Sequence, residues 1–279
     1  MRWVRVVLTS PAALIGILIV GIGVFVAIFA PWLAPHDPLK TILPLAKPGA
    51  VGPDKITLWL GADLLGRDIL ARLIYGTRTV FLWSSLATAA AFVVGVAMGL
   101  VAGFYRGWVD TALSFVANVF LSFPVVVLYI IIITSFSGSG LNIIIAIIFA
   151  SAPTIFRIMR ALALDLRNRD FINAAITQGE SDIAIMVREI LPNATAPLVA
   201  DLCLRFGYTA ITIGVLGFLG LGLPPPTPDW GGMVADGKGM AIAFPHLVIF
   251  PCIAISLLML GLSLLSDGLQ EAIKRVTPT

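Results

Sequence analysis

Long uncharged runs alternate with short charged segments along this chain of 279 residues. Five runs contain no Asp, Glu, Lys or Arg: residues 6–35, 79–105, 111–156, 206–228 and 239–266. A helix of about 20 apolar residues is long enough to cross the hydrocarbon core of a bilayer. The pattern therefore predicts helices that span a membrane several times.

The third run is long enough for two spans, and residues 135–140, mostly Ser and Gly, predict a turn in its middle. Six spans are then expected at approximately residues 11–33, 80–104, 111–134, 141–159, 197–221 and 246–266. The first run is too long for a signal-peptide h-region of about 7 to 15 residues, so we interpret it as a retained span. We expect an all-α polytopic membrane protein, with residues 1–279 forming a single transmembrane domain.

The composition agrees with this interpretation, since 59% of the residues are hydrophobic and only 12% are charged. The net charge of +3 does not indicate nucleic-acid binding, because most basic residues flank apolar runs and do not cluster with aromatic residues. Cys203 and Cys252 lack CxxC spacing and nearby His, so neither a disulfide framework nor a metal site is expected.

Six spans place both termini on the same side of the membrane, and the basic residues indicate which side. The segments on that side contain Arg2, Arg5, Arg106, Arg157, Arg160, Arg167, Arg169, Arg188, Lys274 and Arg275. Cytoplasmic segments carry an excess of Lys and Arg, so both termini are predicted to be cytoplasmic. Arg67, Arg72 and Arg78 would lie on the outer side, against this trend.

The segment 34–78 is then expected outside the membrane, on the periplasmic side. Five prolines between residues 35 and 53 exclude a continuous helix in its first half. In residues 67–75, apolar positions alternate with Arg67, Asp68 and Arg72 at helical spacing. This pattern predicts a short amphipathic helix on the membrane surface that leads into the second span.

Small residues recur at every fourth position of the second span: Ala87, Ala91, Gly95, Gly99 and Gly103. Such a ridge lets another helix approach closely. It predicts a packing interface between helices and not a solute site.

Residues 160–195 form a long polar connection between the fourth and fifth spans, and a loop of this length is usually functional. Asp170 can cap the start of a short helix and Gly179 can end it in a left-handed conformation. Ser181 can cap a second helix through Ile190, and Pro192 either stops that helix or marks the start of the next span.

The short helix is expected to place three side chains on one face, where small residues allow close approach by a partner: Phe171, Ala174 and Ala175. The alternative is a helical hairpin that only caps the end of the bundle.

The same segment resembles the EAA loop of ATP-binding cassette importer permeases, whose pattern is Glu-Ala-Ala, three residues, Gly, nine residues, Ile, one residue, Leu-Pro. Here Asn173-Ala174-Ala175 is followed by Gly179 and by Glu189-Ile190-Leu191-Pro192 at the same spacing. Asn173 and Glu189 depart from the pattern. The resemblance implies contact with an ATPase through Phe171, Asn173, Ala174, Ala175, Gly179, Leu191 and Pro192.

Further segments are similar to the C-type permease subunits of the dipeptide, oligopeptide and nickel importers: residues 30–38, 60–69, 72–78, 218–222 and 225–231. The resemblance implies a bacterial inner-membrane subunit, in contact with lipid, that pairs with a B-type permease subunit as a heterodimer. It also implies two cytoplasmic ATPase subunits and an extracytoplasmic solute-binding protein. The chain has no GxxxxGK[ST] sequence, so ATP and Mg are expected on the ATPases, and the chain itself is not expected to be an enzyme.

Other polar and small residues near the span ends are candidates for pore, gate or partner contacts. Asp201 and Arg205 share a helix face and either line the inner vestibule or form an ion pair at the headgroup level. Gly217, Gly220 and Gly222 either loosen a gate or allow packing and end the helix.

The last outer loop carries Asp229, Trp230 and Asp236. The charged residues, with Lys238, either contact a partner or solute or are ordinary solvated loop charges, and Trp230 can serve as an interfacial or partner anchor.

Di- or oligopeptides are the expected cargo; nickel chelates, glutathione or opines are the alternatives within the same architecture. An ion-coupled secondary transporter would usually place acidic or His residues in mid-span, and none occurs there. An intramembrane enzyme would need a nucleophile with its base or a cluster of metal ligands, whereas His36 and His246 are the only histidines and lie near span ends.

Overall fold

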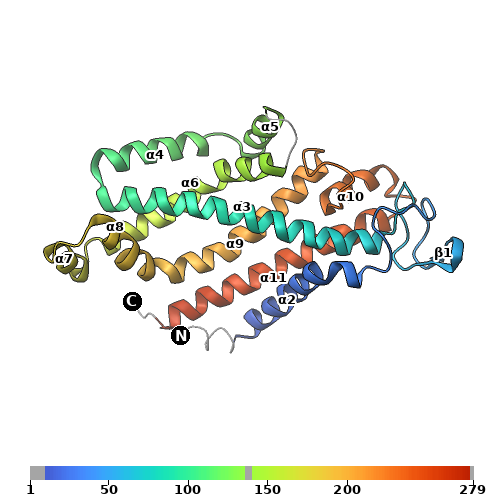
Figure 1. Cartoon of the computed structure of the whole chain (residues 1–279), viewed down its shortest axis with the longest axis horizontal. Helices are drawn as coiled ribbons and strands as arrows, with labels where there is room; N and C mark the ends of the chain where they lie inside the picture. Colours follow the sequence, from blue (N-terminus) through green and yellow to red (C-terminus); the bar gives the residue numbers. More distant parts are fainter. Residues whose placement is uncertain (1–9, 136–139, 277–279) are drawn as a thin grey trace.

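Long helices dominate the computed structural model, which describes residues 10–135 and 140–276 (Figure 1). They are α2 (Pro11–Leu33), α3 (Ile69–Tyr105), α6 (Gly140–Leu166), α9 (Leu191–Phe218) and α11 (His246–Val276). By length and composition, the described residues contain 5 helices able to cross a membrane, or up to 6 when one bent pair is counted. The all-α polytopic fold is therefore confirmed.

The bent pair is α4 (Gly107–Leu121) and α5 (Val125–Ser135), which meet at 91°. The span expected over residues 111–134 is therefore not one continuous helix but a bent pair. Pro124 lies in the break, and proline disfavours a helical conformation in the residue before it and cannot donate a backbone hydrogen bond. Most of the turn expected over residues 135–140 lies outside the described residues.

The second span is longer than expected, because α3 begins at Ile69 and runs unbroken to Tyr105. Asp68 caps its start by accepting a hydrogen bond from the Leu70 backbone N–H at 3.1 Å. The separate surface helix expected over residues 67–75 is wrong. Arg72 is only 4% exposed, so this segment is enclosed by protein and does not divide its faces between lipid and water.

The ridge of small residues on α3 packs against α6, as expected. A β-carbon added to Gly95 would lie 2.7 Å from Ile155 Cβ, and one added to Gly99 would lie 2.7 Å from Met159 Cβ. These distances are shorter than van der Waals contact, so the two helices approach this closely only because the ridge lacks side chains. On the other side of the bundle, α11 packs against α2 and α9.

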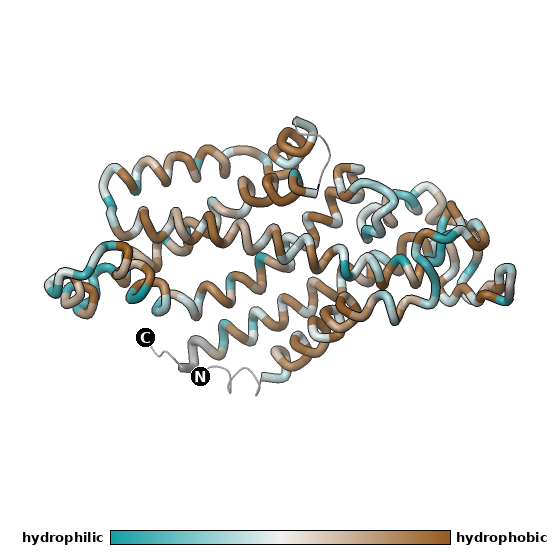
Figure 2. The backbone as a smooth tube through the Cα atoms, viewed as in Figure 1, coloured by the Kyte–Doolittle hydropathy of each residue, from teal (hydrophilic) through white to brown (hydrophobic). Residues whose placement is uncertain are grey.

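The two ends of the bundle carry different irregular structure. At one end, β1 (Ala50–Val51) and β2 (Thr57–Leu58) form an antiparallel pair around η1 (Pro53–Lys55), near α10 (Trp230–Gly237) and η3 (Lys238–Met240). At the other end lie α7 (Asp170–Thr177), α8 (Asp182–Ala184) and the π-helix η2 (Ile185–Ile190). We call these the β1 end and the α7 end. Hydrophilic residues gather at both ends, whereas the helices between them are mainly hydrophobic (Figure 2).

Candidate functional site

The C-terminal end of the α7 segment has the local structure that its sequence predicts, whereas the expected cap at Asp170 is wrong, because Arg169 is the N-cap residue and its side chain makes no capping hydrogen bond. Gly179 follows the end of the helix, and its φ of 80° lies in the left-handed region that glycine adopts without strain. The Glu180 backbone N–H donates to the Ala175 carbonyl at 3.2 Å, which closes the last turn. The sharp end leaves α7 as a short projecting helix (Figure 1).

The chain then enters α9 without a break. The Ser181 hydroxyl caps α8 by accepting a hydrogen bond from the Ala184 N–H at 3.4 Å, as expected. The π-helix follows and runs directly into α9, whose second residue is Pro192. Of the two expected roles, Pro192 therefore marks the start of the next span and does not stop the helix.

The two faces of α7 differ from the expected arrangement. Ile172 is fully buried and Ala175 is 7% exposed, and both belong to a core cluster with Phe104, Met159 and Ile185. Ala175 therefore packs inside this chain, and its expected place on one exposed face with Phe171 and Ala174 is wrong. The reason is that positions three apart, here 172 and 175, share a helix face.

The outer side of the same segment exposes apolar surface. Asn173 and Ala174 are exposed. Four large apolar side chains also remain accessible: Phe171 at 39%, Ile176 at 40%, Ile183 at 70% and Val187 at 52%. Such a combination of a packed inner face and an apolar outer face is typical of a protein docking surface. We call these six side chains the α7 surface.

Charged residues near the α7 surface are solvated or paired. Arg169 Nη2 lies 3.1 Å from Asp165 Oδ2, and both side chains are more than half exposed. The Arg167 guanidinium lies 5.3 Å from the centre of the Phe104 ring. The described residues contain no group of three His, Cys, Asp or Glu side chains able to hold a metal ion.

Asp201 and Arg205 form the expected i,i+4 pair in α9, with 3.3 Å between Arg205 Nε and Asp201 Oδ2. Their side chains are 16% and 22% exposed, so the pair is largely covered by its own chain. Its role in a solute path or at the headgroup level stays a prediction.

The three glycines at the C-terminal end of α9 have distinct roles. Gly220 has φ of 77°, and the following Leu221 N–H donates to the Leu216 carbonyl at 2.8 Å, which ends the helix. A β-carbon on Gly217 would overlap the Asp229 carboxylate, and one on Gly222 would lie 2.6 Å from Gly217 Cα. Helix termination and tight packing therefore account for their local geometry, and gating stays a prediction.

Of the two alternatives for the last outer loop, a solvated charge is wrong for Asp229, which is only 4% exposed, and Trp230 is buried to the same extent. Trp230 packs over Gly76, and its indole N–H donates to the Leu73 carbonyl at 3.1 Å. The absence of a side chain on Gly76 creates the space for this indole. Trp230 is therefore an internal anchor between α10 and α3, and not a surface anchor for a partner.

Asp229 caps α10, since its Oδ2 accepts a hydrogen bond from the Gly232 N–H at 2.9 Å. Burial raises the pKa of this carboxyl group above its usual value, because the charged form is removed from water. Asp236, by contrast, keeps a side chain that is 57% exposed and lies 3.8 Å from Arg67 Nη2.

A charged cluster at the β1 end was not predicted from the sequence. Asp63 accepts hydrogen bonds from two backbone N–H groups at Oδ1 and from Arg67 Nε at 2.7 Å at Oδ2. Arg72 Nε lies 3.5 Å from the same Oδ2, and the two groups form an ion pair without a hydrogen bond at Nε. The sequence feature that could have revealed this cluster is Arg72, a charged residue within an otherwise apolar helix face. A charged residue in such a place near a membrane is by default a candidate functional residue.

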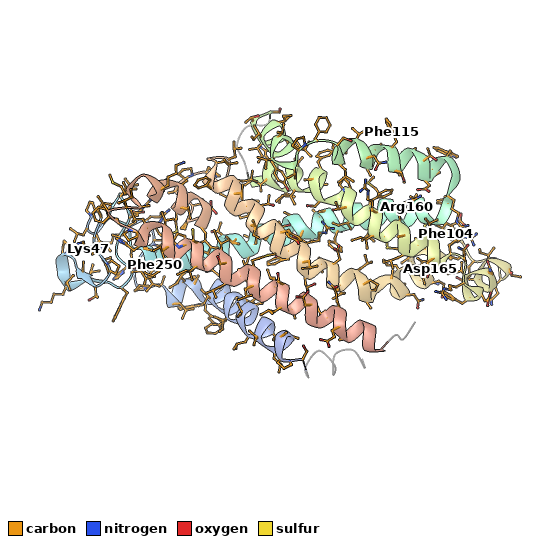
Figure 3. The ribbon with its side chains drawn as sticks, turned by 180° about the vertical axis from the view of Figure 1, so that it is seen from behind. Lys47, Phe104, Phe115, Arg160, Asp165 and Phe250 are labelled. Carbon is orange, nitrogen blue, oxygen red and sulfur yellow. The ribbon has the colours of Figure 1, made fainter. Side chains whose placement is uncertain are left out.

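Polar contacts also tie α4 to α6. Arg160 forms an ion pair with Asp110, including 2.6 Å between Arg160 Nη2 and Asp110 Oδ2, and Arg157 Nη2 lies 2.8 Å from Asn118 Oδ1. Phe115, by contrast, is 68% exposed and lies on the outer side of α4 (Figure 3). In the sequence these two arginines indicate only the topology of the chain.

Comparisons with known proteins agree with one another. Residues 95–277 match the family described as binding-protein-dependent transport system inner membrane component. Residues 2–48 match the N-terminal TM domain of oligopeptide transport permease C.

Among similar proteins, the dipeptide transport system permease protein DppC of Alkalihalophilus pseudofirmus is 34% identical over 94% of this chain and 84% of that protein. The glutathione transport system permease protein GsiD of Pectobacterium atrosepticum is 37% identical over 77% of this chain and 71% of that protein. An inward-facing structure of the MetNI methionine ABC transporter superposes with a TM-score of 0.58 at 18% identity, covering 74% of this chain and 96% of that chain. The structural likeness shows a shared fold.

Proposed function

The chain belongs to the family of binding-protein-dependent transport system inner membrane components and is a multi-pass permease of an ATP-binding cassette importer, and we propose that it forms half of a translocation path for di- or oligopeptides. Relatives named for dipeptide and for glutathione transport support a cargo that contains peptide bonds. Nickel chelates, glutathione and opines are the alternative cargoes for the same architecture.

The proposed assembly contains a related B-type permease subunit, two cytoplasmic ATPase subunits and an extracytoplasmic solute-binding protein. ATP and Mg would be bound by the ATPases, since this chain has no phosphate-binding loop sequence. The exposed apolar sides of the spans, such as α2, would contact lipid or the second permease subunit.

The observation that carries the coupling role is the two-sided packing of α7. Its outer side presents the α7 surface, while Ile172 and Ala175 pack into a cluster that includes Phe104 of α3 and Met159 of α6. Packed side chains transmit displacement because protein interiors are dense and hardly compressible. An ATPase that moves α7 as it closes around ATP would therefore displace the ends of two spans.

We assign the α7 end to the cytoplasm and the β1 end to the solute-binding protein, in the bacterial inner membrane. The start of α2 and the end of α11 lie toward the α7 end (Figure 1), which would make both termini cytoplasmic. The segment 160–195 would then be the cytoplasmic coupling loop, and 34–78 would be the periplasmic segment, whose last residues, from Ile69, belong to α3. Asp236 remains a candidate surface contact for the delivering protein, while Asp229 and Trp230 are buried beneath the surface of the same segment.

The test is uptake of a labelled dipeptide by cells that lack this chain, compared with the same cells complemented by it. The host strain should lack other peptide importers, so that no second system masks the defect. Loss and restoration of uptake are expected. Unchanged uptake would exclude dipeptide cargo and direct the same assay to glutathione, nickel chelates and opines.

A further inference from the structure

A small cavity opens at the β1 end, between the start of α3, the end of α9 and the α10 segment. Its volume is about 190 Å3, and its wall includes Arg72, Gly220, Thr227, Asp229 and Asp236. Sites for whole drug-sized ligands occupy about 300 to 1,000 Å3. This cavity is therefore large enough for one polar end of a solute and not for a long molecule.

Two charged side chains in the cavity wall have unused hydrogen-bonding groups. Arg72 and Asp229 are each 4% exposed. Nε and Nη1 of Arg72 and Oδ1 of Asp229 have no hydrogen-bond partner among the described residues. Buried charged groups are nearly always hydrogen-bonded, so these atoms require a partner.

The surrounding structure explains why the protein does not supply that partner. Both oxygens of Asp63 are already occupied by Arg67 and by backbone N–H groups. Asp229 is held by its cap on α10 and by the close approach of Gly217. Arg72 is held by its ion pair with Asp63, and each of the two side chains keeps an atom without a hydrogen bond, a donor on Arg72 and an acceptor on Asp229.

The chemistry of these groups defines what would fill the cavity. Nη1 of Arg72 offers N–H donors that a carboxylate oxygen can accept, while Nε lies 3.5 Å from Asp63 Oδ2. Asp229 Oδ1 accepts a hydrogen bond from an ammonium or amide N–H. A solute that presents both groups close together would satisfy both side chains at once.

We propose that this cavity binds the polar end of the transported solute, with a carboxylate on Arg72 and an N–H donor on Asp229. The inference rests on the importer function proposed for the chain, and it narrows the solute class to molecules that carry both groups. A peptide carboxyl terminus with its last amide N–H belongs to this class. The cavity lies at the β1 end, where the solute would enter from the binding protein.

The experiment measures thiol labelling at the cavity in the assembled importer in membranes. Thr227→Cys, in a Cys203→Ser and Cys252→Ser background, places one reactive thiol in the cavity wall. L-alanyl-L-alanine or glutathione is expected to slow its labelling about tenfold at roughly ten times the Kd, because a bound solute covers the thiol. N-acetyl-L-alanyl-L-alanine amide, which lacks both terminal charges, should protect much less.

Arg72→Gln should abolish the protection, and Arg78→Gln is the matched control, because Arg78 lies on the same helix, is exposed and does not line the cavity. Equal labelling rates with and without every solute would overturn the inference and leave a cavity that holds only water. Should Arg72→Gln fail to assemble, Arg72→Lys and Asp229→Asn test the same two contacts. The labelling assay on the Thr227→Cys protein that keeps Arg72 and Asp229 tests whether solute binds in the cavity, and it needs none of these substitutions.

ATP-driven uptake is measured in parallel. Uptake without protection would overturn the cavity inference and leave the importer function intact. Protection without uptake of either solute would support the site and contradict the proposed cargo.

Discussion

The α7 end and the β1 end of the bundle differ in where they place charged side chains. At the α7 end, apolar residues fill the interior and the Arg169–Asp165 pair stays in solvent, with side chains 61% and 65% exposed. At the β1 end, Asp63, Arg72 and Asp229 are all less than 9% exposed. An apolar outer surface suits a protein partner, whereas buried charges with free hydrogen-bonding groups suit a small polar ligand. The same chain therefore offers two different kinds of site at its two ends.

The largest expected effect is at the β1 end. Trp230→Ala removes a buried indole and its hydrogen bond to Leu73, so it should lower the free energy of unfolding by about 3 to 5 kcal/mol. Thermal unfolding of the purified protein measures the loss. Trp108→Ala is the matched control, because that side chain is 81% exposed, and it should change stability little. Equal losses in both variants would contradict the assigned role of Trp230 as an internal anchor.

The next effect distinguishes the two faces of α7. Ala175→Asp buries a carboxylate in the core cluster and should destabilise the chain by about 1 to 3 kcal/mol or more. Ala174→Asp lies on the exposed face and should leave membrane insertion and stability intact while it prevents docking of the ATPase. Thermal unfolding and co-purification with the ATPase separate the two effects. Normal co-purification and normal uptake with Ala174→Asp would disprove docking through this face.

A smaller effect should appear as pH dependence at Asp229. Burial raises its pKa in the folded state, so the stability that the protonated group contributes is complete below the unfolded pKa of about 4 and is lost as pH rises through the folded pKa. Asp229→Asn should remove this loss, and thermal unfolding measured between acidic and neutral pH tests it. Asp236→Asn, at an exposed position, is the control. A pH profile unchanged by Asp229→Asn would contradict the assignment.

The smallest effect is expected for the exposed pair at the α7 end. Arg169→Ala should change the free energy of unfolding by no more than about 0.5 kcal/mol, because solvent screens the interaction with Asp165. A stability loss comparable to that of Trp230→Ala would show that surface charge also stabilises the α7 end. The contrast between the two ends would then be incorrect.

Local features of the fold were predictable because they depend on neighbouring residues. The long apolar runs predict the spans, Gly179 ends α7, Ser181 caps α8, and the small ridge of α3 packs against α6. The break at Pro124 was also encoded locally, but the hydropathy of residues 111–134 concealed it. The exposed face of α7 was only partly predicted, since a helix pattern does not show which side meets its own core.

The sequence by itself determined that this chain is a helical membrane protein with a projecting helix between its fourth and fifth spans, because hydrophobic length and turn chemistry act over a few residues. Only the tertiary structure decided that Ala175 is internal and that Arg72 and Asp229 share one cavity wall. The Trp230 hydrogen bond to Leu73 joins residues 157 positions apart, and nothing near either residue in the sequence specifies the other. Burial of a charge depends on which distant segments cover it, so it is a property of the packed bundle and not of the local pattern.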